Sequence, residues 1–216
     1  MKRCFRKVVS LISAVAIAAS MSVCAFASDS QTDTGFTPDY DSTWGDLYRY
    51  FDPEGFEVLP PEIQKQYDSV LLFDDGEANV VAMDDAETTV STSGFIYTEE
   101  SSEVAEPRDK DIAGITNLSL KVSSTKSEIE YTVGLLSTIP CPWLYCTVSM
   151  YDADNGKFID MDSSSEEDAM VCSIDGSFTD LERKHTYTIR SIGLVTPPAG
   201  YISSGPLSAQ IDKATK

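Results

Sequence analysis

Apolar and polar residues alternate through most of the chain after Ile112, and this period of two constrains the fold more than any other feature. Successive side chains on a β-strand point to opposite faces, so the alternation predicts strands with one apolar face each. Six runs show the pattern between turn residues, and residues 158–160 are a weaker seventh. The inward positions are Leu118, Leu120 and Val122; Ile129, Tyr131, Val133 and Leu135; Cys146, Val148 and Met150; Met170, Cys172 and Ile174; Tyr187, Ile189, Ile192 and Leu194; and Leu207, Ala209 and Ile211.

Strands with one apolar face become stable when two sheets bury those faces against each other. We therefore predict an all-β chain in which residues 112–216 form a seven-stranded antiparallel sandwich. Each strand is short and separated from the next by a turn, which is typical of a sandwich.

The end of this segment carries a recognisable spacing. Leu181 is followed six residues later by Tyr187, and Ile189 continues an alternating run. This spacing resembles the fibronectin type III family of Ig-like sandwiches, and residues 200–211 resemble its last loop and strand. The resemblance implies a tyrosine corner, with the Tyr187 ring in the core and its hydroxyl bonded to backbone. The early strands lack the family's buried tryptophan, and Arg183 replaces its common proline. Such modules are mostly spacers or binding scaffolds, so the resemblance implies no active site.

The first 27 residues have the pattern of a secretory signal peptide. Four basic residues precede an apolar stretch, and Ala25 and Ala27 supply the small residues of a cleavage site. The apolar stretch is shorter than the roughly 20 residues that a membrane span needs. We expect a mature chain that begins near Ser28, is secreted into the extracellular space and does not insert into membranes. Lipid attachment at Cys24 and a retained anchor are the alternatives. The leader resembles those of Gram-positive secreted proteins.

Two polar segments flank the next part of the chain. Residues 28–41 have no apolar period and are predicted to be a flexible arm. Residues 74–111 are rich in Asp, Glu, Ser and Thr, a composition that buries too little to fold, so we predict a disordered acidic linker. Two apolar islands interrupt that linker, at 80–83 and 95–97, and either can form a stray strand.

Residues 42–73 are predicted to form two short helices with an aromatic face. Ser42 or Thr43 can cap the first helix, and the Pro60-Pro61 pair suits the start of the second. Helices this short are not stable alone, so they dock either on the sandwich or on a partner. The second reading makes them a binding surface for an extracellular protein or a glycan. The candidate binding residues are Trp44, Tyr48, Tyr50, Phe51 and Phe56.

Three cysteines follow the leader, namely Cys141, Cys146 and Cys172, and an odd number leaves at least one thiol unbridged. Alternation places Cys146 and Cys172 inside the sandwich. Buried free thiols, a Cys146–Cys172 disulfide across the core and a local Cys141–Cys146 bridge all remain open. A zinc site would need His185 as its fourth ligand, and we predict no metal.

The single histidine and one acidic loop are the remaining candidates for a catalytic or metal site. His185 lies just before Tyr187, where a turn or strand-edge role suffices. The loop that begins at Asp152 places its glycine fifth and Ser163 twelfth, so it fails the EF-hand pattern. Asn155-Gly156 between two apolar runs predicts a hairpin turn instead, because both residues tolerate positive φ.

These observations favour a binding role over catalysis. The net charge of −19 argues against nucleic acid and anionic lipid as partners. No catalytic motif and no cofactor site are predicted. We expect a secreted extracellular binding or cell-surface interaction protein; the alternatives are a structural spacer and a carboxylate-based extracellular hydrolase.

Overall fold

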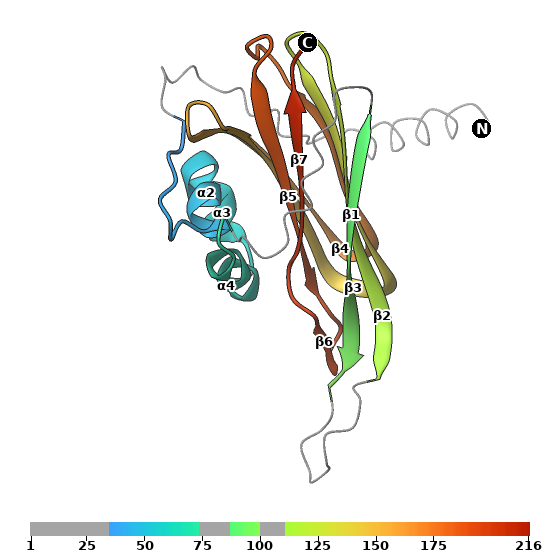
Figure 1. Cartoon of the computed structure of the whole chain (residues 1–216). Coiled ribbons are helices and arrows are strands. Elements are labelled where there is room, and N and C mark those ends of the chain that lie inside the picture. The colour runs from blue at the N-terminus through green and yellow to red at the C-terminus, as the bar shows by residue number, and fades with distance from the viewer. Residues whose placement is uncertain (1–34, 74–86, 100–110) are drawn as a thin grey trace, which may run out of the picture. The chain divides into compact units, whose positions relative to one another are not determined.

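The strands of this chain form one antiparallel sheet that curls back on itself (Figure 1). The computed structural model describes residues 35–73, 87–99 and 111–216, so the predicted leader at 1–27 lies outside the described residues. The sheet has seven strands in the order β6-β1-β2-β3-β5-β7, with β4 paired to β3. Their bounds are β1 (Thr88–Thr98), β2 (Ile112–Ser124), β3 (Ile129–Asp152), β4 (Lys157–Phe178), β5 (Thr186–Thr196), β6 (Tyr201–Ser203) and β7 (Leu207–Ala214). The prediction of a mostly β, antiparallel chain is confirmed.

The long strand β3 is the reason that the sheet curls. Its first part pairs with β2 from Ile129 to Ser137, and its last part pairs with β5 from Trp143 to Asp152. Strand β4 runs antiparallel along the opposite edge of both parts. Because β2 and β5 share one edge of β3 at different heights, the two halves of the sheet face each other. Strand β7 consequently contacts β1 and β2, with which it shares no backbone ladder.

The bend in β3 and β4 falls where the sequence supplies two prolines. Pro140 and Pro142 have no N–H to donate. Pro140 lies within the register shift between Leu136 and Cys141, and Pro142 follows directly after Cys141. Across from them, Asp168 on β4 has a φ of 48°. These bends join runs that the alternation predicted as separate strands, so 129–135 and 146–150 are both parts of β3. The same bend leaves Met170 exposed rather than inward as predicted.

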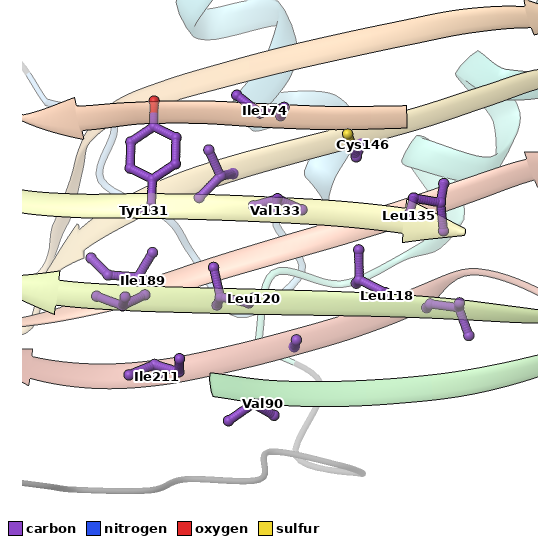
Figure 2. Close-up of a cluster of buried hydrophobic side chains, with 14 of the residues drawn as sticks. Val90, Leu118, Leu120, Tyr131, Val133, Leu135, Cys146, Ile174, Ile189 and Ile211 are labelled. Carbon is purple, nitrogen blue, oxygen red and sulfur yellow. The ribbon is translucent and has the colours of Figure 1, made fainter. Parts of the chain in front are cut away.

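A single core lies between the facing halves of the sheet. Figure 2 shows side chains of β1, β2, β3, β4, β5 and β7 gathered there, including Val90, Leu120, Ile174 and Ile211. Burying each such aliphatic side chain contributes about 1.5–3 kcal/mol, and this is the main stabilising force of the sheet. The predicted inward positions from Leu118 to Leu135 all belong to this core.

Strand β1 corrects the prediction of a disordered linker over 74–111. Thr88–Thr98 pairs with β2 from Val122 to Ile112, and its far end pairs with β6. Val90 and Ile96 are buried and anchor a strand whose other residues, apart from Phe95 and Tyr97, are Ser, Thr and Gly. The apolar island at 95–97, expected as a stray strand, lies at the end of β1, and the threonines before it favour a strand because a neighbouring strand is present. Residues 74–86 and 100–110 lie outside the described residues.

The segment 42–73 forms α2 (Trp44–Phe51), α3 (Pro53–Val58) and α4 (Pro61–Ser69). Thr43 caps α2 in a capping box with Asp46. Asp52 ends α2 and caps α3, because Pro53 suits the first helical turn and the Asp52 side chain accepts the N–H of Gly55. Asp52 therefore both ends α2 and begins α3, and the segment has three described helices instead of the two predicted. No described helix is long and apolar enough to cross a membrane.

The three helices form a layer on the sheet of their own chain. Leu47, Phe56 and Ile63 pack with Tyr145 of β3 and with residues of β4 and β5 in a second buried cluster. The remaining strand residues of this cluster are Phe158, Ile192 and Leu194. The side chains of β5 are buried on both faces because the core lies on one side and the helices on the other.

The N-terminal arm is ordered where it reaches the sheet. Phe36 donates its N–H to the carbonyl of Phe158 at 2.9 Å and accepts the N–H of Phe158 at 2.8 Å. The side chain of Ser42 bonds to Asp39. The prediction of a flexible arm over 28–41 is therefore corrected for residues 35–41, because a bridge to β4 holds them.

Candidate functional site

Strand β4 is a long edge strand. The strand has 22 residues and pairs with β3 along one edge, with two register shifts, and Phe36 meets the other edge at Phe158. Beyond Phe158, no other part of the described chain pairs with that second edge. An open edge presents backbone N–H and C=O groups that can pair with another extended chain. This edge is the candidate functional site.

Carboxylates line this stretch of β4. The strand contains Lys157 near its start and then a run of acidic residues, all of them exposed. Like charges so close together repel one another and create a strongly negative local field. A cationic ligand would relieve that repulsion, whereas an acidic ligand would increase it. The acidic residues are Asp160, Asp162, Glu166, Glu167 and Asp168.

The outward amides in the acidic part of β4 fall into two groups. The N–H of Met161 donates to Asp160 Oδ1 and the N–H of Ser163 donates to Asp162 Oδ1, both at 2.8 Å. The next positions of the same parity are Ser165 and Glu167, and the described chain provides no partner of this kind for their amides. The first group of amides is already hydrogen-bonded to side chains of β4 itself. We call this part of the edge blunted, because amides that are already bonded discourage pairing with another strand. Within this acidic part of the edge, the stretch 165–167 is open to a new strand.

The helical layer and β3 hold the blunted part in place. Tyr131 donates its hydroxyl to Asp162 Oδ2 at 3.0 Å, and the hydroxyl of Tyr48 lies 3.0 Å from Ser163 Oγ. Burial, followed by the charge of Asp162, raises the pKa of Tyr131, so that it remains a neutral donor. These two contacts hold the backbone of β4 in place directly before the open stretch 165–167. A ligand strand would therefore pair with a rigid edge.

The five predicted binding aromatics do not form one exposed surface. Trp44, Tyr48 and Phe56 are buried, with 3%, 6% and 3% of their surface exposed. Phe51 is half-buried, and Tyr50 is 42% exposed with its ring against Phe51. The hypothesis of a free aromatic docking segment is corrected for the three buried residues, because their faces pack on β3, β4 and β5. The alternative interpretation of the same pattern, in which the helices dock on the sheet of their own chain, agrees with this packing.

The three cysteines occupy two places in the core. Cys146 and Cys172 are buried, and their Sγ atoms lie 3.2 Å apart as free thiols. Cys141 is separate, and its thiol donates to Ser137 Oγ and to the carbonyl of Ile139. The two inward cysteines therefore meet across the core as alternation suggested, whereas Cys141 and Cys146 each contact other groups.

Tyr187 has the arrangement described above as a tyrosine corner. Its side chain is buried, and its hydroxyl accepts the backbone N–H of Glu182 at 3.1 Å. Leu181 packs in the same core. The loop before β5 is therefore tied to the strand it feeds, and both residues are structural.

His185 lies between carboxylates beside this corner. Its Nε2 is 2.8 Å from Asp152 Oδ1, and its Nδ1 is 3.2 Å from Asp154 Oδ2 and 3.7 Å from Glu182 Oε2. The hydrogen bond to Asp152 raises the pKa of His185. Burial opposes ionisation of Asp152, but the bonds from His185 and Asn155 outweigh it and lower the pKa of that carboxyl. A protonated ring that donates from both nitrogens fits this geometry.

The ligand atoms of Asp152, Asp154 and His185 lie within 4.8 Å of one another, and they are the described residues best arranged to hold a cation. Asp152 already accepts the backbone N–H groups of Asp154 and Asn155 and the Asn155 amide. These hydrogen bonds hold the turn between β3 and β4, which is a sufficient structural role for Asp152. The predicted hairpin turn at Asn155-Gly156 is confirmed, and within it Gly156 alone has positive φ, at 67°.

Sequence reasoning missed the acidic edge of β4. Residues 161–169 fall between two predicted strands because they show no apolar alternation. A strand that is exposed on both faces has no reason to alternate. The available signal was negative: this stretch contains neither glycine nor proline, the residues that usually mark a loop.

No protein-family model and no curated protein matches the chain. Among solved structures, it is similar to the CARDB domain of a Pyrococcus furiosus protein in complex with di-metal ions. The similarity covers 45% of this chain and 84% of that one, at 15% identity and a TM-score of 0.31. The function of this mostly β chain is therefore argued from its own residues.

Proposed function

We propose that this chain is an exported, non-catalytic binding protein whose β4 edge receives an extended, basic segment of an extracellular partner. The observation that carries the proposal is the stretch 165–167, an open strand edge beside exposed carboxylates. Strand addition would supply backbone hydrogen bonds, and the charges would select the partner.

The sheet suits this role if its two facing halves are the layers of an Ig-like sandwich of the fibronectin type III kind. The contacts of β7 with β1 and β2 support two layers, and the bond between Tyr187 and Glu182 supports the resemblance. Sandwiches of this class present edges and loops on a rigid core. A rigid edge binds with a small loss of conformational entropy.

A non-catalytic role agrees with the placement of the reactive groups. The three cysteines among the described residues are all buried, whereas a nucleophilic cysteine needs an accessible thiolate. His185 is held by Asp152 and Asp154 as part of a turn. These cysteines and this histidine therefore make contacts that stabilise the fold.

A second copy of this chain is a poor occupant of the edge. Pairing β4 with β4 would bring Glu166 and Glu167 of one molecule beside the carboxylates of the other, and like charges across a strand pair are destabilising. A strand with alternating lysine or arginine would place its cations next to those carboxylates. Charge complementarity thus favours a basic partner over self-association.

Isothermal titration calorimetry with a synthetic peptide of alternating lysine and threonine tests the proposal. A peptide of alternating glutamate and threonine is the control ligand. We expect the basic peptide alone to bind, with an affinity that falls as salt is raised. The variant Ser165→Pro removes one outward amide without touching the β3 ladder, and it should weaken binding about tenfold or more.

The charge contribution has its own matched pair of variants. Glu166→Gln with Glu167→Gln should weaken binding of the basic peptide, whereas Glu54→Gln with Glu62→Gln makes the same change in net charge on the helices and should leave binding unaltered. Equal losses in both double variants would show unspecific attraction to an acidic protein. No binding of the basic peptide to the wild-type chain would favour a structural spacer.

A further inference from the structure

The two buried thiols of the core come from different halves of the curled sheet. Cys146 lies on the part of β3 that pairs with β5, opposite Gly193. Cys172 lies on the part of β4 opposite Leu135, where β3 pairs with β2. The two cysteines are 26 positions apart in sequence, and their sulfur atoms are 3.2 Å apart. A bond between them would therefore tie the two halves of the sheet together.

The surroundings of the pair argue against a metal. Among the described residues, no third cysteine, histidine or carboxylate joins Cys146 and Cys172 in a group able to hold an ion. Cys141 is occupied with Ser137 and the carbonyl of Ile139. The pair is thus a dithiol in an apolar core, and oxidation to a disulfide is the chemistry open to it.

We propose that Cys146 and Cys172 are an oxidation site and form a disulfide in the oxidising space to which the predicted leader directs the chain. The oxidant is a disulfide, either a small molecule or a thiol–disulfide oxidoreductase. The thiolate of one cysteine attacks the oxidant and forms a mixed disulfide, releasing one oxidant thiol. The second cysteine then displaces the other oxidant sulfur. Two protein thiols become one disulfide, and the oxidant leaves as two thiols that carry the two electrons and two protons.

The timing of this step follows from burial. Cys146 is 0% and Cys172 is 1% exposed, so an oxidant cannot reach either sulfur in the folded chain. The hydrogen bond to Cys172 and burial both raise the pKa of Cys146, which further slows attack. The bond therefore forms while the chain folds, before the core closes. Once formed, it is equally protected from reductants.

Refolding with and without an oxidant tests this inference, and it does not depend on ligand binding by β4. The full mature chain is unfolded and reduced, then refolded in a glutathione redox buffer or in excess reductant. Free thiols are alkylated in denaturant, and intact mass and peptide mapping locate the bond. We expect the oxidised sample to lose two hydrogens, to alkylate once at Cys141, and to link the peptides that contain Cys146 and Cys172.

Two further samples make the test specific. Cys141→Ala should still form the bond with the same yield, because Cys141 takes no part in it. Reduced chain that is folded before the oxidant is added should remain alkylatable at all three cysteines for much longer. Three free thiols after refolding in the redox buffer, or a map that links Cys141 to Cys146, would overturn the proposal. Peptide mapping of the wild-type chain decides the pairing even if a variant fails to fold.

Discussion

The hydroxyl of Tyr67 on α4 lies 2.7 Å from the Oγ1 of Thr147 on β3, and both side chains are buried. A polar pair at the centre of an apolar contact fixes the position of one layer on the other, because either group alone would lose its hydrogen bond. Desolvation raises the pKa of Tyr67, so that its hydroxyl stays protonated. This bond fixes the helical layer on the outer face of β3. The aromatic side chains of the helices that pack there are therefore not available as an exposed binding surface.

Removing one partner of this bond should destabilise the chain. Tyr67→Phe leaves Thr147 Oγ1 buried without its partner, and we expect a loss of about 1–3 kcal/mol in the free energy of unfolding. Tyr40 is 86% exposed, so Tyr40→Phe is the matched control and should have no measurable effect. Urea denaturation followed by tryptophan fluorescence measures both. Equal stability of the two variants would show that the helices are not locked through this bond.

The buried aromatics of the helices should be needed for stability. Phe56→Ala removes a ring that packs with Tyr48 and Tyr67, and a cavity of that size costs about 3–5 kcal/mol. Val58 is 82% exposed two residues away, so Val58→Ala should cost little. Thermal unfolding followed by circular dichroism compares them. An unchanged midpoint in Phe56→Ala would contradict docking of the helices on their own sheet.

His185 predicts a defined dependence of stability on pH. Its pKa is raised by Asp152, so its contribution is complete below its unfolded pKa of about 6.5 and is lost as pH rises through the higher folded value. The pKa of Asp152 is lowered, so its contribution disappears when the pH falls through that low value. Asp154 and Glu182 also face the ring and act in the same direction as Asp152.

The His185→Gln variant isolates this effect from the large net charge. The difference in unfolding free energy between wild type and variant should be greatest in mildly acidic solution and should shrink at alkaline pH. Urea titrations at a series of pH values measure it. A difference that stays constant from mildly acidic to alkaline pH would show that the charge of His185 plays no part.

Gly176 should resist substitution because Tyr131 crosses it. A Cβ at Gly176 would collide with the Tyr131 hydroxyl, which also donates to Asp162. Gly176→Ala should therefore displace that ring and cost about 1–3 kcal/mol. Gly134 lies on the strand opposite, where a Cβ would meet only Ser119 Oγ at 3.1 Å, so Gly134→Ala is the milder control. Chemical denaturation of the two variants measures the contrast, and equal effects would contradict it.

Alternation located most of the core but could not give the topology. It placed Leu118, Val133 and Ile211 inward, because those parts of the sheet have one face against the core and one outside. It could not show that 129–135 and 146–150 belong to one strand, since Pro140 and Pro142 read as a break. The bend that accommodates them depends on β2, β4 and β5 pairing around β3, which is not local information.

The candidate site was the least predictable part of the chain. Trp44 and Phe56 stand out in the sequence. An aromatic helix face has the same sequence pattern whether it packs on its own sheet or on a partner, so the pattern alone does not distinguish the two. The acidic stretch around Glu166 looked like a loop because an exposed edge strand needs no apolar face. Export through residues 1–27 remains a prediction, and N-terminal sequencing of the exported chain would test cleavage before Ser28.

Hydrogen–deuterium exchange tests the central claim most directly, because it reports on the outward amides of β4 themselves. The full mature chain is labelled with and without a saturating amount of the basic peptide, and exchange is resolved to single residues by NMR. The account predicts that the amides of Ser165 and Glu167 become protected, while those of Met161 and Ser163, already bonded to Asp160 and Asp162, change little. Protection confined to the helices, or bound peptide with no protection at Ser165 and Glu167, would contradict it.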